Sequence, residues 1–246
     1  KEKKFREGQA EQVLDTLFFD FIDLAKKLQP KVIIAENVKG LLQGKANLVV
    51  NDIRKAFNDA GYIVQDWVLN AKNMGVPQNR ERVFFIAMRK DLAGPFLHQK
   101  DLFSKVPKLE LDFKEKEIVF FKILDINAEK DTLSKNYTKL MRELRPGEKD
   151  LRHATKRLIG KENNFGNKIL YYDKVCYCVI ANDKDIVFSE NRFKTAKEFI
   201  RAGSFPVDYN FLKLKPNYLI GMSVPPVMTA QIAHQIYIQW LSKLNP

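Results

Sequence analysis

The chain has 246 residues, 45% of them apolar, and a formal net charge of +12. This apolar content argues against a disordered chain, and no apolar run is long enough to span a bilayer. No signal peptide is apparent, and the two cysteines, Cys176 and Cys178, form neither a disulfide framework nor a zinc pattern. We therefore expect one large or two modest globular domains in a reducing, cytoplasmic setting, without a structural metal.

Half of the net charge lies in one stretch of the sequence. Residues 130–161 hold ten Lys or Arg against four Asp or Glu. A local basic excess of this size is typical of a surface that binds a polyanion such as nucleic acid. A solvated surface that only keeps the protein soluble explains these charges equally well.

Helix and strand patterns alternate over residues 1–91. Residues 1–12 are polar, and we expect a loop there. The expected elements that follow are helices over residues 15–28 and 46–60 and strands over residues 31–38, 62–69 and 82–88. Residues 32–35 show no polar alternation, which is typical of a parallel strand covered on both faces. This order predicts an α/β fold, the second half of a doubly wound sheet.

The pattern becomes irregular after Arg89. We expect a weak strand within residues 109–122, helices over residues 134–144 and 226–244, a loop over residues 160–166 and a strand over residues 174–180. Thr195 and Glu198 have the spacing of a capping box, which predicts a short helix. We assign residues 1–91 and 215–246 to one domain and residues 92–214 to a second, smaller and irregular domain.

Two sets of polar residues are candidates for chemistry. Glu36 and Asn37 stand at the carboxyl end of the strand over residues 31–38, where open α/β sheets bind ligands. Arg80 and Arg82 would project from one face if both lay in the strand that follows them. The plain alternatives are a polar turn and a pair of surface arginines.

Five motifs, in their order and spacing, resemble those of the cytosine-5 DNA methyltransferases. They are Asp15-Thr16-Leu17-Phe18-Phe19, Glu36-Asn37-Val38-Lys39-Gly40, Gly75-Val76-Pro77-Gln78-Asn79-Arg80-Glu81-Arg82, Thr195-Ala196-Lys197-Glu198 leading to Ser204-Phe205-Pro206, and Ile220-Gly221-Met222-Ser223-Val224-Pro225. Met222 stands where the family usually has Asn. The resemblance implies the S-adenosylmethionine-dependent methyltransferase fold with a smaller target-recognition domain.

The resemblance also implies roles for the candidate residues. Glu36 would hydrogen-bond N3 and the 4-amino group of a cytosine flipped out of the duplex, and Asn37 would fix the pocket. Arg82 would hold O2 of that base, and Arg80 would brace the loop or a phosphate.

The cofactor and the DNA are assigned to other residues. Ser223 and Val224 would line the S-adenosylmethionine pocket. The expected partner is double-stranded DNA, and its predicted contacts are Gln78, Arg142, Arg145, Arg152, Lys156 and Arg157.

The catalytic cysteine of the family lies in a Pro-Cys-Gln stretch, which this sequence does not contain. The Phe-x-Gly-x-Gly cofactor loop of the family is also missing. Cys176 and Cys178 lie in an apolar run of the small domain, and we reject them as nucleophiles. We therefore expect an N-terminal half of the enzyme, either in the same polypeptide or as a separate subunit.

The sequence therefore predicts the C-terminal part of a DNA (cytosine-5) methyltransferase of a bacterial restriction–modification system. It would transfer a methyl group from S-adenosylmethionine to a cytosine in a short duplex site. An RNA (tRNA) methyltransferase of the same family and a non-catalytic DNA-binding subunit are the alternatives.

Overall fold

The computed structural model describes residues 17–43, 47–101, 104–160, 167–181 and 184–244. These residues form two compact units. The first comprises the described residues up to Leu69, Arg82–Glu110 and the chain from Trp240 on, and the second comprises Asn70–Glu81 and Leu111–Gln239. The loops expected over residues 1–12 and 160–166 lie outside the described residues, apart from Gly160.

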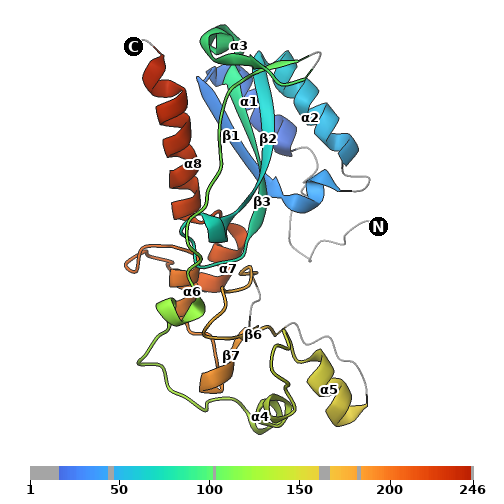
Figure 1. Ribbon diagram of the computed structural model, residues 1–246, viewed down its shortest axis with the longest axis vertical. Coiled ribbons are helices and arrows are strands. Elements are labelled where there is room, and N and C mark those ends of the chain that lie inside the picture. The colour runs from blue at the N-terminus through green and yellow to red at the C-terminus, as the bar shows by residue number, and fades with distance from the viewer. Residues whose placement is uncertain (1–16, 44–46, 102–103, 161–166, 182–183, 245–246) are drawn as a thin grey trace. The chain divides into compact units, whose positions relative to one another are not determined.

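The first unit is built on a three-stranded sheet in the order β1-β3-β2 (Figure 1). Its strands are β1 (Val32–Val38), β2 (Tyr62–Asn70) and β3 (Glu81–Arg89), all three of which the sequence predicts. β1 pairs with β3 in antiparallel register, with Glu36 opposite Phe84. The expectation of a parallel strand is therefore wrong for this neighbour, because β3 returns between β1 and β2.

Two helices cover one face of this sheet (Figure 1). They are α1 (Leu17–Leu28) and α2 (Asn47–Asp59), and both confirm the sequence prediction. Gly61 follows α2 with φ +92°, a left-handed conformation that glycine adopts without strain. The apolar core between helices and sheet is formed by Ile22, Ala25, Ile33, Ala35, Val50, Ile53, Phe57, Ala60, Tyr62, Val83, Phe85 and Ala87.

A short hairpin completes the first unit. After α3 (Lys90–Ala93), strands β4 (Leu97–Gln99) and β5 (Lys105–Pro107) pair in antiparallel register. The Gln65 amide on β2 donates to the Pro107 carbonyl at 2.7 Å, and the buried Trp240 indole donates to the Lys108 carbonyl at 2.7 Å. The first bond attaches the hairpin to the sheet, and the second attaches the segment after the hairpin to Trp240.

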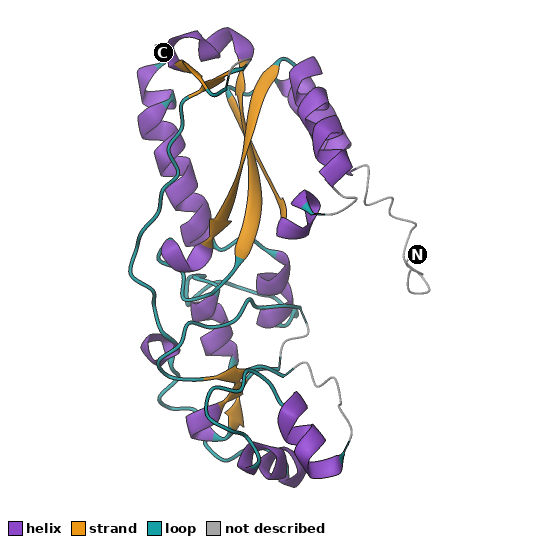
Figure 2. Ribbon diagram, turned by 45° about the vertical axis from the view of Figure 1, so that its right-hand side comes forward, coloured by secondary structure: helices purple, strands orange, loops and turns teal. Residues whose placement is uncertain are grey.

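The second unit is mostly helix and irregular chain (Figure 2). Its short strands, β6 (Ile169–Leu170), β7 (Ile186–Val187) and β8 (Arg192–Phe193), form a sheet in that order. Its helices are α4 (Lys135–Arg142), α5 (Arg152–Ile159), α6 (Ala196–Ala202), α7 (Pro216–Met222) and α8 (Pro226–Gln239). Single turns of 3-10 helix occur in this unit at Ala71–Asn73, Phe120–Ile123 and Phe188–Glu190, and in the first unit at Lys39–Leu42, Gly94–Phe96 and Leu241–Lys243.

Several predictions for the second unit are confirmed and others are wrong. Helices α4 and α8 form where predicted, and α6 begins with the expected capping box of Thr195 and Glu198. The strands expected within residues 109–122 and 174–180 do not form. Cys176 forms an isolated bridge to Gln78 instead of a strand, since the backbone around it bonds to the segment before β3.

The predicted domain boundaries at residues 92 and 215 do not coincide with the division between the two units. The hairpin belongs with the first unit, and α7 and α8 belong with the second.

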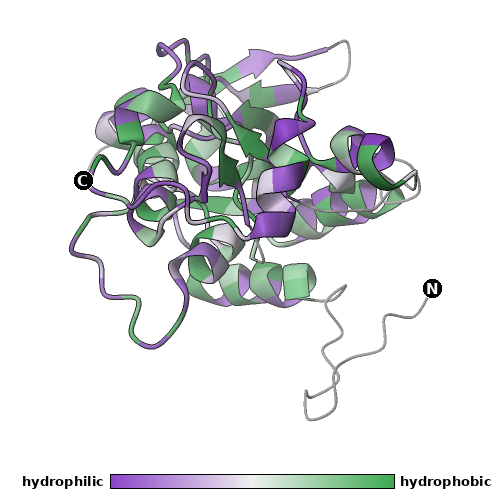
Figure 3. Ribbon diagram, turned by 90° about the horizontal axis from the view of Figure 1, so that it is seen from below, coloured by the Kyte–Doolittle hydropathy of each residue, from purple (hydrophilic) through white to green (hydrophobic). Residues whose placement is uncertain are grey.

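The helices carry both hydrophobic and hydrophilic residues (Figure 3). Within the part of the chain that the structure describes, no helix has the length and apolar character to cross a membrane.

Candidate active site

Glu36 and Arg82 lie together at one end of the sheet in the first unit. Glu36 is opposite Phe84, and Arg82 lies two residues before Phe84, so the two side chains share one face of the sheet. Arg82 Nε lies 2.8 Å from Glu36 Oε1, and the side chains are 14% and 27% exposed. A guanidinium and a carboxylate are thus held in contact and partly shielded from water. They lie near the end of β1 and the start of β3.

A cavity of about 400 Å³ opens beside Glu36. Asn37 also lines it, and the Asn37 side chain accepts a hydrogen bond from the Val38 amide at 2.8 Å, which fixes the end of β1. The remaining lining is apolar and comes from α1 and β1: Leu17, Phe18, Phe21, Ile34 and Ala35. The carboxylate of Glu36 therefore borders a cavity large enough for a small planar molecule.

An apolar groove continues from this cavity along the edge formed by α1 and β1. A second cavity of about 230 Å³ shares Phe21 and Ile34 with the first. We define the edge groove by its exposed large apolar side chains, which are Leu17, Phe21, Leu24, Leu28 and Ile34. In the sheet that the structure describes, β1 is a terminal strand, so the groove follows an open sheet edge.

Arg80 occupies a different environment in the second unit. β3 begins at Glu81, so Arg80 lies outside the strand and does not share a face with Arg82 as expected. The Arg80 side chain is 2% exposed, and its guanidinium donates to the carbonyls of Val179, Gly221 and Ser223 at 3.3, 3.2 and 2.7 Å. This arginine bonds to main chain rather than presenting its charge to a pocket.

Gln78 is also buried, which corrects its predicted role as a DNA contact. Its amide oxygen accepts from the Val179 amide at 3.0 Å, and its amide nitrogen donates to the Ala202 carbonyl at 3.1 Å. With the side chain at 0% exposure, neither atom is presented to a ligand. Gln78 and Arg80 together fix the segment before β3.

Ser223 and Val224 form the turn between α7 and α8. Both are half-buried, and the Ser223 hydroxyl donates to the Ile220 carbonyl at 3.1 Å while its oxygen can still accept. A hydroxyl beside a partly exposed apolar side chain suits the ribose and the adenine of an adenosyl group. Met222, which departs from the family pattern, is 70% exposed and takes no part in the core.

Two of the predicted DNA contacts are engaged in ion pairs on the basic segment. Arg152 binds Asp150 at 2.9 Å, and Arg157 binds Glu148 at 2.7 Å. The hydrogen bond from Arg152 lowers the pKa of the Asp150 carboxyl, and that from Arg157 lowers the pKa of the Glu148 carboxyl. These pairs brace the turn between α4 and α5.

The other predicted DNA contacts in this segment are exposed: Arg142, Arg145 and Lys156. Below them lies a small apolar core of Leu133, Leu140, Leu151, Ile169 and Ile186. Helices α4 and α5 therefore present cations on a packed support.

A buried ionic cluster, which the sequence reasoning missed, anchors α6 in the second unit. Arg192 contacts Glu190 at 3.0 Å and Glu198 at 2.6 Å, and all three side chains are at most 3% exposed. The Tyr172 hydroxyl donates to Glu190 at 2.6 Å. Burial, reinforced by Glu190, raises the pKa of Tyr172 to about 12. Glu198 in the capping box was the only local signal of this cluster.

Comparison with known proteins identifies the family. Residues 1–238 match the model of the C-5 cytosine-specific DNA methylases. The chain belongs to this family. Among curated relatives, it is 50% identical over 76 residues to the type II methyltransferase M.FnuDI of Fusobacterium nucleatum. It is also 46% identical over 84 residues to the type II methyltransferase M.NgoPII of Neisseria gonorrhoeae.

These matches span only part of each protein. They cover 31% and 34% of this methylase chain, and 22% and 25% of the two relatives' length. Solved structures match over more of the chain. A protein described as a DNA modification methyltransferase encoded within a prophage (E. coli) matches with a TM-score of 0.64 and 21% identity. The DNMT2 of Spodoptera frugiperda matches with a TM-score of 0.60 and 19% identity.

Both structural matches cover 95% of this methylase chain and 76% of the other chain. At these identities they establish the α/β methyltransferase fold and nothing finer.

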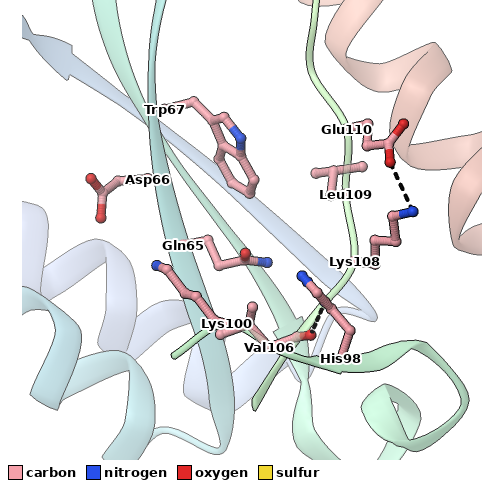
Figure 4. Close-up of a pocket in the computed structure, with 9 residues that line it drawn as sticks. All are labelled: Gln65, Asp66, Trp67, His98, Lys100, Val106, Lys108, Leu109 and Glu110. Carbon is pink, nitrogen blue, oxygen red and sulfur yellow. Dashed lines mark hydrogen bonds and ion pairs between the residues drawn. The ribbon is translucent and has the colours of Figure 1, made fainter. Parts of the chain in front are cut away.

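A further cavity of about 340 Å³ lies between β2 and the hairpin of the first unit (Figure 4). Two ion pairs lie in its wall: Asp66 contacts Arg54 at 2.6 Å, and Lys108 contacts Glu110 at 2.8 Å. The His98 ring bonds the Val106 carbonyl at 2.8 Å. No sequence pattern marks this cavity, because separate segments form it, and it holds none of the predicted site residues.

Proposed function

We propose that this chain supplies the part of a DNA (cytosine-5) methyltransferase that recognises and activates the target cytosine. The observation that carries the proposal is the contact between Glu36 and Arg82 at 2.8 Å, beside a cavity of about 400 Å³. The type II names of the bacterial relatives support a restriction–modification system and a bacterial cytoplasmic setting.

The pair has the groups that cytosine activation requires. C5 of cytosine is a poor nucleophile until a thiolate adds to C6 and N3 accepts a proton. The carboxyl group of Glu36 would share that proton with N3 and accept a hydrogen bond from the 4-amino group. Arg82 would hold O2 and keep Glu36 in place. The base reaches such a site only by flipping out of the duplex.

The methyl group would come from S-adenosylmethionine, with Ser223 and Val224 as one wall of its site. Neither cysteine of the chain fits the nucleophile, since Cys176 is buried and Cys178 lies against the Arg80 guanidinium. The thiolate would therefore come from outside these 246 residues.

Duplex DNA would lie against α4 and α5. Arg142, Arg145 and Lys156 would contact phosphates directly. Arg152 and Arg157 would add charge while holding the turn through Asp150 and Glu148. Phosphate contacts of this kind position the protein but do not read sequence.

The edge groove is the proposed docking site of the N-terminal half of the enzyme, whether joined or a separate subunit. Apolar side chains line an open strand edge there, and such edges are usually covered or blunted in folded proteins. Glu36 lines the cavity at one end of this groove, so the docked half would also complete the reaction site. The solved relatives extend beyond the part that this chain covers, which leaves sequence to fill the groove.

Calorimetry with S-adenosylmethionine tests this docking. We expect no saturable binding to the 246 residues alone, and binding after the N-terminal half is added. Leu24→Glu in the groove should prevent this recovery, whereas Leu48→Glu, at an exposed position on α2 outside the groove, should not. Saturable binding to a monodisperse sample of the chain alone would contradict the proposal.

Methyl transfer to two substrates tests the function itself. The basic segment would suit RNA as well as DNA, so tRNA is the competing substrate. Full-length enzyme with labelled S-adenosylmethionine should label duplex DNA and leave tRNA unlabelled. Label in tRNA alone would favour the RNA methyltransferase, and label in neither would favour a DNA-binding subunit.

A further inference from the structure

Arg80 joins segments of the second unit that lie far apart in the sequence. Its Nη1 donates to the Val179 carbonyl at 3.3 Å, and its Nη2 donates to the Gly221 and Ser223 carbonyls at 3.2 and 2.7 Å. The bond to Ser223 is the shortest of the three. One planar guanidinium thus holds both the turn after α7 and the chain at Val179.

The last turn of α7 also packs closely against residues 180–181. A Cβ atom added at Gly221 would lie 2.6 Å from the Ala181 amide nitrogen and 2.7 Å from the Ile180 carbonyl carbon. Both are main-chain atoms, so neither can move aside as a flexible side chain would. The contact depends on glycine because the two backbones touch there.

Residues 176–179 are fixed in turn by the segment before β3. The Val179 amide donates to Gln78, and the Asn79 amide donates to the Cys176 carbonyl at 2.8 Å. Arg80 therefore connects a main-chain framework, set by its own segment, to the turn that carries Ser223 and Val224. The carbonyl of Ser223 cannot shift without losing its bond to Arg80.

We propose that Arg80 is a positioning residue for the cofactor. By holding the Gly221 and Ser223 carbonyls, it sets the backbone from which Ser223 and Val224 meet the adenosyl group. The inference rests on the proposed function, in which these two residues line the S-adenosylmethionine site. Arg80 would act on cofactor affinity, while Glu36 and Arg82 act on the base.

The test compares three variants of the full-length enzyme with the unmodified protein. Arg80→Lys keeps the charge but loses the fork that reaches several carbonyls at once. Gly221→Ala pushes the end of α7 away from residues 180–181 while the Arg80 side chain itself is unchanged. Arg201→Lys is the matched control, because Arg201 also donates to main-chain carbonyls of the second unit, those of Ile123 and Leu124 at 3.1 and 2.8 Å.

Calorimetry with S-adenosylmethionine and steady-state kinetics give the readouts. We expect Arg80→Lys and Gly221→Ala each to raise the dissociation constant and the KM for the cofactor about tenfold, the loss of one hydrogen bond to a charged group. The kcat and the affinity for DNA should stay within about twofold, and Arg201→Lys should leave cofactor binding unchanged.

The outcomes separate the inference from the function on which it rests. Unmodified enzyme that fails to bind S-adenosylmethionine would overturn the proposed function and, with it, the inference. Unmodified enzyme that binds the cofactor while Arg80→Lys and Gly221→Ala bind it equally well would overturn the inference alone. An equal loss in Arg201→Lys would also overturn it, since any weakened packing would then have the same effect.

Discussion

The polar end of the sheet and the segment before β3 use the same kinds of side chain in different ways. In the first unit, Arg82 contacts the side chain of Glu36 beside a cavity. In the second unit, Arg80 and Gln78 bond to main-chain groups and are almost fully buried. The two arginines are only two residues apart in the sequence.

The difference shows what decides whether a polar side chain is available for chemistry. A side chain that contacts another side chain beside a cavity can exchange part of that contact for a ligand. A side chain bonded to buried carbonyls cannot, because each lost bond leaves an unsatisfied buried group. Under the proposed function, one motif would supply one arginine for the reaction and another for the architecture, and mutations should separate the two roles.

The largest expected effect comes from Glu36→Gln. Glutamine cannot give N3 the proton it needs, and a positioned acid or base contributes about 10²–10⁴-fold to the rate. We expect methyl transfer by the full-length enzyme to fall by that factor, with DNA affinity unchanged. Asp66→Asn is the control, because Asp66 also contacts an arginine in the first unit, at 2.6 Å. Equal turnover in Glu36→Gln and Asp66→Asn would remove Glu36 from the mechanism.

A smaller loss is expected from Arg82→Lys, which keeps the charge but not the planar donors. A hydrogen bond to a charged group is worth about 1.5–3 kcal/mol, so methyl transfer should fall about 10- to 100-fold. Because Arg82 acts with Glu36, the double variant Glu36→Gln/Arg82→Lys should be little slower than Glu36→Gln alone. Fully additive losses in single-turnover rates would mean that the two residues act independently.

Gln78→Leu should affect stability rather than chemistry. It leaves the Val179 amide and the Ala202 carbonyl without their bonds to Gln78, at a cost of about 1–3 kcal/mol for a buried group. At this chain length, thermal melting should shift down by about 2–4 °C per kcal/mol. Gln235→Leu, on the half-buried side of α8, is the control. If Gln78→Leu instead lowered turnover without lowering the melting temperature, Gln78 would act in the reaction and not in the architecture, which would contradict the comparison.

The basic segment should behave as a phosphate-binding surface. The double variant Arg142→Gln/Arg145→Gln should weaken binding to cognate and non-cognate duplexes alike. The slope of log K against log salt concentration should become shallower by ~0.9 per lost phosphate contact. Lys213→Gln, an exposed lysine outside the segment, should leave the slope unchanged. If the salt slope of Arg142→Gln/Arg145→Gln equalled that of the unmodified enzyme, these charges would only keep the protein soluble.

The smallest expected effect is the pH dependence of stability that comes from the ion pairs Arg152–Asp150 and Arg157–Glu148. The folded pKa values of Asp150 and Glu148 lie below their ordinary values of 3.8 and 4.5. Their contribution to stability is therefore complete above those values and is lost as the pH falls through the lower, folded pKa. Circular dichroism melts should show this acid loss reduced in Asp150→Asn and kept in Asp112→Asn. An identical acid profile for both variants would exclude a role for the pair.

Local periodicity made the first unit predictable. The strands and helices of the sheet follow from apolar spacing within each segment, and Glu36 and Arg82 come together because β3 returns beside β1. The parallel direction expected for β1 was wrong, because strand direction is set by the neighbour and not by the strand itself. The apolar run alone cannot identify that neighbour.

Distant contacts decide what the sequence could not show. Gln78 is buried by groups 101 and 124 positions later, so its polar character alone suggested a surface role. Helix α5 was missed because Leu151 at its start gives no side-chain cap. The strand expected over residues 174–180 is absent, since its backbone bonds to the segment around Gln78 instead of a neighbouring strand.

Bisulfite sequencing of DNA from cells that express the full-length gene tests the central claim most directly. Methylation at C5 protects cytosine from conversion, so the product can be read at each base. If Glu36 and Arg82 activate a cytosine in duplex DNA, protected cytosines should occur at one short recurring site and disappear with Glu36→Gln. Genomic DNA that converts completely in cells making the unmodified enzyme would contradict the account.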